Sequence, residues 1–74
     1  MNDLRPTQKK MIESLLLSKE LQLEESMITL DVLINTCLSE VPRNQEKARR
    51  LIFNHTQVAN ELNEVRELIK LINL

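Results

Sequence analysis

The 74-residue sequence contains no glycine, one cysteine, one aromatic residue and two prolines. Without glycine it lacks the tight turns that bind phosphate in P-loop and dinucleotide-binding proteins, which need positive φ or close approach to the backbone. A single cysteine excludes an intrachain disulfide. Cys37 and His55 alone fall short of the four ligands that a structural zinc site normally takes. We therefore expect no metal, no cofactor and no small-molecule substrate.

Strong net charge and long apolar runs are also absent. The formal net charge is −1, so the overall balance does not indicate binding to nucleic acid or to an anionic membrane. No apolar run approaches the roughly 20 residues of a membrane span, and residues 1–10 lack the apolar core of a signal peptide. We expect a cytoplasmic protein, in which a lone thiol stays reduced.

What the chain does contain is two series of apolar residues at alternating steps of four and three. This spacing is typical of a helix that packs against another helix. The first series is Leu23, Met27, Leu30, Ile34, Cys37 and Val41, and the second is Ala48, Leu51, His55, Val58, Leu62, Val65, Ile69 and Ile72. We call these two series the seam. They predict an all-α antiparallel two-helix hairpin, one domain spanning residues 1–74, with helices at about 8–39 and 45–73 and a turn at 40–44.

Residues at the helix ends refine this prediction. Pro42 should end the first helix, because it disfavours helical backbone at the preceding residue, and Asn44 is a good N-cap for the second. Asp3 or Thr7 is expected to cap the first helix. We also expect a bend or a change of packing partner at residues 18–20, because Glu20 occupies a position that continues the seam.

The apolar residues outnumber those that a hairpin can bury. A chain this short seldom gains more than roughly 3–5 kcal/mol from one core, and without a disulfide or metal the remaining source of stability is a second protein chain. Residues displaced from the seam stay in water unless a partner covers them. We therefore expect the hairpin to be completed by a partner or by dimerisation into a helical bundle. The predicted protein-binding residues are Leu17, Leu21, Ile28, Val32, Phe53, Leu68 and Leu71.

Candidate catalytic residues are few, and each has a simpler structural interpretation. His55 lies on the seam with no carboxylate at helical spacing to orient it, and Cys37 lies there with no basic neighbour to lower its pKa. Cys37 is interpreted as a packing residue, and His55 as a packing or partly exposed histidine. The carboxylates need a water-restricted cleft for catalysis, which two helices do not provide. We expect no enzymatic activity.

The chain as a whole resembles the small helical co-chaperones of type III secretion systems, the YscE/PscE/SsaE/EscE group. The resemblance lies in residues 12–17, with the polar residues 18–20 after them, and in the start of the second helix at residues 45–47. It continues through the apolar series at the end of that helix: Leu62, Val65, Leu68, Ile69 and Ile72.

This resemblance implies a bacterial cytoplasmic protein, linked to virulence, that binds a tetratricopeptide (TPR)-like chaperone. The pair would keep the needle-forming subunit soluble and unpolymerised. The alternative from the residues alone is a small dimeric helical regulator that inhibits a signalling enzyme or acts in transcription. That regulator would act through its basic cluster, Arg43, Lys47, Arg49 and Arg50.

Overall fold

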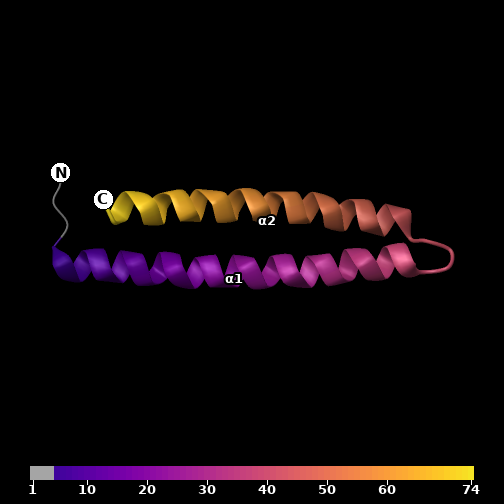
Figure 1. Ribbon diagram of the computed structural model, residues 1–74, viewed down its shortest axis with the longest axis horizontal. Helices are drawn as coiled ribbons and strands as arrows, with labels where there is room; N and C mark the ends of the chain where they lie inside the picture. The colour runs from indigo at the N-terminus through magenta and orange to yellow at the C-terminus, as the bar shows by residue number, and fades with distance from the viewer. Residues whose placement is uncertain (1–4) are drawn as a thin grey trace.

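The computed structural model describes residues 5–74, which form two helices and, within this range, no strand. Helix α1 spans Pro6–Ser39 and helix α2 spans Gln45–Ile72. They run antiparallel and lie side by side (Figure 1), as a rod with extents of 57 × 16 × 13 Å. The predicted antiparallel helical hairpin is therefore confirmed.

The beginning of α1 differs from the prediction. Arg5 occupies the N-cap position and Pro6 lies in the first turn, where its missing N–H costs no hydrogen bond. The backbone N of Arg5 donates to Oε1 of Gln8 at 3.1 Å. Thr7 is already helical, so its expected capping role is wrong, and Asp3 lies outside the described residues.

The connector between the helices agrees with the sequence pattern. α1 ends at Ser39, and extended backbone at Glu40 follows it. Oδ1 of Asn44 accepts a hydrogen bond from the backbone N of Lys47 at 3.2 Å, so the predicted N-cap is confirmed. The backbone N of Asn44 also donates to the carbonyl of Cys37 at 3.2 Å, which fixes the two helix ends together across the connector.

The core follows the seam. Its buried residues are Leu23, Cys37, Ala48, Leu62 and Val65. Leu16, Met27, Val58 and Ile69 pack against the cluster of Leu23, Leu62 and Val65. The exception is Val41, which is 98% exposed because it follows the end of α1 and lies in the connector.

Of the bend or change of packing partner expected at residues 18–20, the bend is absent. α1 is one continuous helix, and its ribbon runs straight through this region (Figure 1). Glu20 is tolerated on the seam because Arg66 of α2 donates to its carboxylate at 3.1 Å. A polar seam residue with a partner on the opposite helix does not need to break its own helix.

The helices differ in length, with 34 residues in α1 and 28 in α2. As a result, the N-terminal end of α1 extends past the last turn of α2 (Figure 1). The start of α1 and the end of α2 lie at this end of the rod, which we call the open end, and the connector forms the other.

Candidate protein-binding surface

The structure places all seven predicted protein-binding residues at the surface. Their exposed fractions run from 47% at Leu17 to 65% at Ile28. By contrast, five residues in the described range are buried apolar residues. The hairpin therefore leaves more large apolar side chains exposed than it buries.

These residues do not form one continuous patch. In an antiparallel helix pair, the positions that directly follow seam residues face the same side of the pair. Such positions include Glu24 and Asp31 in α1, and Ala59 and Arg66 in α2. The 2.8 Å distance between Glu24 Oε2 and Arg66 Nη2 confirms this placement. We call this surface the Arg66 side. By spacing it includes Leu17, Leu21, Glu24, Ile28, Asp31, Asn35 and Leu38 of α1, and Arg49, Ile52, Thr56, Ala59, Asn63, Arg66 and Lys70 of α2.

A hollow on the Arg66 side brings two predicted residues together. Leu21 and Ile28 line it from α1, and Ala59 lines it from α2. Met27 and the buried Leu62 also line it, so the hollow reaches the core. The short side chain of Ala59 leaves room between the helices, and sequence reasoning had not assigned this residue a role.

Arg66 joins the helices through two carboxylates. Its Nε lies 3.1 Å from Oε2 of Glu20, and its Nη2 lies 2.8 Å from Oε2 of Glu24. The hydrogen bond to Glu20 is the main cause of a raised pKa of Arg66; partial desolvation opposes it, and the hydrogen bond and charge of Glu24 reinforce it. The sequence analysis did not predict these pairs, because both carboxylates belong to the opposite helix.

His55 also has a partner that the sequence did not reveal. Its Nε2 lies 3.1 Å from Oδ1 of Asp31, on the opposite helix. Helical spacing relates only neighbours within one helix, so it does not show this carboxylate on the other. Pairing the two seams in register would have found it, because His55 and Asp31 lie at the same level of the rod.

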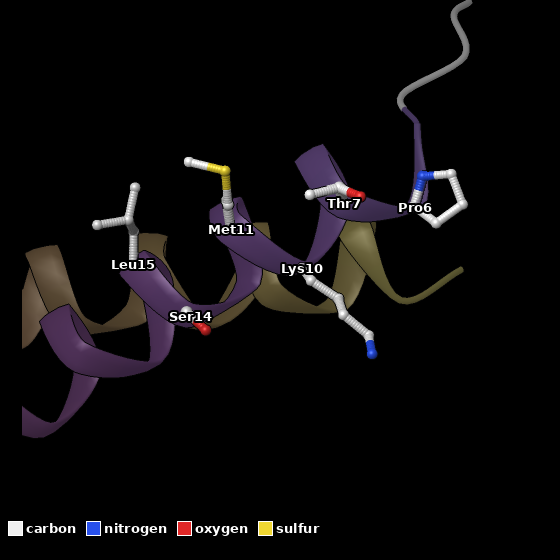
Figure 2. A pocket seen from close by; sticks show the side chains of 6 residues that line it. All are labelled: Pro6, Thr7, Lys10, Met11, Ser14 and Leu15. Atoms are coloured by element: carbon white, nitrogen blue, oxygen red, sulfur yellow. The ribbon is translucent and has the colours of Figure 1, made fainter.

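The open end carries two exposed apolar residues that were not among the predicted contacts. Met11 is 62% exposed and Leu15 is 70% exposed. Figure 2 shows their side chains one turn apart, pointing in the same direction from α1, while Lys10 points elsewhere. They line a shallow hollow together with Pro6, Thr7, Lys10 and Ser14, all from α1. The sequence did contain an indication of this exposed surface, because apolar residues surround more than one face of this segment.

Cys37 and the basic cluster are the remaining candidate residues. Cys37 is 1% exposed, so its thiol is not accessible to a substrate. Arg50 of the basic cluster lies 3.4 Å from Glu46 in an exposed pair one helical turn apart. Within residues 5–74, no three His, Cys, Asp or Glu side chains are grouped so as to hold a metal ion.

Neither α1 nor α2 is both long enough and apolar enough to cross a membrane.

Comparison with known proteins gives no further assignment. No protein-family model, no curated protein and no solved structure matches this chain.

Proposed function

We propose that this protein is a non-enzymatic co-chaperone that binds a TPR-like chaperone through its exposed apolar residues. The observation that carries the proposal is the exposure of all seven predicted contact residues on a hairpin with a small core. Large apolar side chains left in water favour association, because each buried side chain gains roughly 1.5–3 kcal/mol of transfer free energy.

The distribution of these residues favours a concave partner. Leu17, Leu21 and Ile28 belong to the Arg66 side, whereas Val32 and Phe53 lie at other positions around their helices. A flat partner surface covers one side of a rod. A solenoid of helical repeats has a concave surface that can surround a rod and cover several sides together.

The specific role follows from the resemblance to type III secretion co-chaperones. In this role the hairpin and its TPR-like partner together hold the needle-forming subunit in the bacterial cytoplasm and prevent its polymerisation. The hairpin stabilises its partner and performs no chemistry. The accessible residues fit this role, because they are apolar and their spacing suits helix packing.

Co-expression tests the proposal. The full chain is produced with the TPR-like chaperone and needle subunit of a type III secretion system from the same organism, and complexes are sized by light scattering. We expect a ternary complex that holds the needle subunit unpolymerised. The double variant Val32→Glu and Phe53→Glu should be lost from the complex, whereas Gln57→Glu, which adds charge at an exposed polar position, should remain. A needle subunit equally unpolymerised without this protein would overturn the proposal.

A further inference from the structure

The side of the hairpin opposite the Arg66 side carries further exposed apolar residues. It consists of the positions that directly precede seam residues, with Leu16 and Glu20 continuing the seam towards the open end. A hollow lined by Gln22, Ser26 and Asn54 shows that both helices contribute to it. We call this surface the Lys19 side. By spacing it includes Leu15, Lys19, Gln22, Ser26, Thr29, Leu33, Thr36 and Glu40, and Lys47, Arg50, Asn54, Gln57, Glu61, Glu64, Leu68 and Leu71.

The open end of the Lys19 side combines an apolar group with two charges of opposite sign. Leu15, Leu68 and Leu71 are 70%, 49% and 62% exposed. Lys19 of α1 and Glu64 of α2 lie beside them along their helices. Neither of these two makes a salt bridge within residues 5–74, so both are available to another chain.

The register between the helices gives each residue a level along the rod. The cross-helix pairs Glu20–Arg66 and Asp31–His55 have residue numbers that both add to 86. The numbers of Leu15 and Leu71 also add to 86, so these two leucines lie at the same level. By the same register, position 64 of α2 lies at the level of position 22 of α1.

We propose that a second copy of this chain docks on the Lys19 side, related by a two-fold axis parallel to the rod. Such an axis keeps the level of each residue and places α1 of one copy on α2 of the other. Leu15 then meets Leu71 of the second copy, and Lys19 lies within one helical turn of Glu64 of the second copy. The axis repeats every contact, as an isologous interface requires. The pairs that meet at one level, to within one residue, are Leu15–Leu71, Lys19–Leu68, Gln22–Glu64, Ser26–Glu61, Thr29–Gln57, Leu33–Asn54, Thr36–Arg50 and Glu40–Lys47.

Charge complementarity favours this occupant. No two residues of like charge meet in the arrangement, and Lys19 and Glu64 bring opposite charges together near the open end. At the connector, Glu40 meets Lys47 of the second copy, and neither makes a salt bridge within residues 5–74. Between the two ends, the side-chain amide of Gln22 can donate to Glu64 of the second copy.

A two-fold axis across the rod is disfavoured by the same residues. It reverses the level and sets each helix on its own copy. With the two rods fully overlapped, Leu71 would meet Lys47 of the second copy, and Leu15 would meet Glu40. The exposed leucines would then lie on charged side chains, whereas the parallel axis places them on one another.

The available area suits a weak dimer. The 28 residues of α2 at 1.5 Å per residue give an overlap about 40 Å long. Across the 16 Å width of the rod, this covers roughly 650 Å² per copy, or about 1,300 Å² in total, at the lower end of the range of specific interfaces.

This inference goes beyond the proposed function and does not depend on it. The dimer covers Leu68 and Leu71 but leaves Leu21 and Ile28 on the Arg66 side exposed. A chaperone that binds the Arg66 side alone is therefore compatible with the dimer, whereas one that covers Leu68 and Leu71 would have to displace the second copy.

Sedimentation equilibrium of the purified full chain is the first test. We expect a reversible monomer–dimer equilibrium. A monomer at every concentration up to about 1 mM, which corresponds to the weakest specific affinities, would overturn the proposal. So would a trimer or a higher assembly, because a two-fold isologous interface closes at two copies.

Charge exchange tests which residues meet. Lys19→Glu and Glu64→Lys should each weaken dimerisation about tenfold, because the two-fold axis gives each variant two pairs of like charge. An equimolar mixture of the two variants should form heterodimers with an affinity within about threefold of the original chain, since both pairs are then of opposite charge. The control Lys10→Glu, seven residues before Leu17 on the Arg66 side, should leave the affinity unchanged. Single variants that dimerise like the original chain, or a mixture no tighter than either variant alone, would exclude this interface.

Disulfide formation tests the level. Leu15→Cys and Leu71→Cys, mixed in equal amounts under mild oxidation, should give a covalent heterodimer, because the axis places these positions opposite one another. Cys37 stays in place, since it is 1% exposed, and the original chain shows any background from its thiol. The control mixture of Leu15→Cys with Gln57→Cys should give little, because position 57 lies about 21 Å further along the same side. Equal yields from the two mixtures, with helix content unchanged by circular dichroism, would overturn the proposed register.

Discussion

Leu21 and Ile28 lie two helical turns apart on α1, line the same hollow and are both more than half exposed. The floor of that hollow includes Met27 and Leu62, so exposed apolar side chains stand beside the core without belonging to it. This relationship separates the residues that hold the hairpin together from those available to another chain, and it allows each group to be tested by substitution.

Leu21→Glu and Ile28→Glu should abolish the proposed binding to a TPR-like chaperone and leave helix content largely intact. Each change adds a charge at a position that is in water in the isolated hairpin, so the fold loses little, whereas an apolar interface would have to bury that charge. Circular dichroism and a pull-down with the chaperone measure the two effects. Loss of helix content in the isolated chain would show that these side chains belong to the core.

Leu23→Ala should unfold most of the hairpin. Leu23 is 5% exposed and packs with Leu62 and Val65, and truncating such a buried leucine costs about 2–5 kcal/mol. That loss is comparable with the whole stability of so small a core. Leu15→Ala, which truncates a leucine that is 70% exposed, should change the unfolding free energy by about 0.5 kcal/mol or less. Urea denaturation compares the two, and equal effects would contradict the assignment of the core.

Asn44→Ala should lower stability by about 1 kcal/mol, because it removes the side-chain oxygen that accepts from the backbone N of Lys47. Asn60→Ala is the matched control, since Asn60 is an exposed asparagine inside the same helix. There alanine should be neutral or slightly stabilising, because it has the higher helix propensity. Thermal unfolding of both variants checks this difference, and an equal loss would argue against the cap.

Arg66→Ala should lower the free energy of unfolding only slightly, because the pairs with Glu20 and Glu24 are partly exposed and screened by solvent. The raised pKa of Arg66 means that folding favours its charged form. This contribution is present below the unfolded pKa and is lost only as the pH rises through the higher folded value. We therefore expect that the titration of Arg66 does not contribute to any change, between pH 6 and pH 9, in the difference in unfolding free energy between Arg66→Ala and the original chain. Urea denaturation at the two pH values measures this difference. A much larger cost would show that these pairs hold the fold.

The sequence was sufficient to predict the hairpin because its seam is almost uninterrupted in both helices. The 4–3 spacing identified Leu23 and Leu62 as core residues, and Asn44 as a cap followed from local chemistry. The pairs of Arg66 with Glu20 and of His55 with Asp31 could not be found from periodicity within one helix, because they depend on the register between two helices. Thr7 was misassigned because the helix begins one residue before it, at Pro6.

The exposed residues were also predicted from the sequence, but their arrangement was not. Spacing alone showed that Leu17, Leu21 and Ile28 lie off the seam. It did not show that Ala59 opens a hollow beside them, because the depth of a hollow depends on the side chains that the other helix brings to the same level. It also did not single out Met11 and Leu15 among the apolar residues of the first helix.

The central claim is that the apolar residues outside the core are in water in the isolated chain and are covered in the complex. Solvent paramagnetic relaxation of the methyl groups, measured by NMR, tests it most directly. At concentrations where the protein is monomeric, we predict strong relaxation at Ile28, Val32 and Leu71 and weak relaxation at Leu23 and Leu62. Addition of the TPR-like chaperone should protect the first group. Protection of Ile28, Val32 and Leu71 already in the isolated monomer would contradict the account.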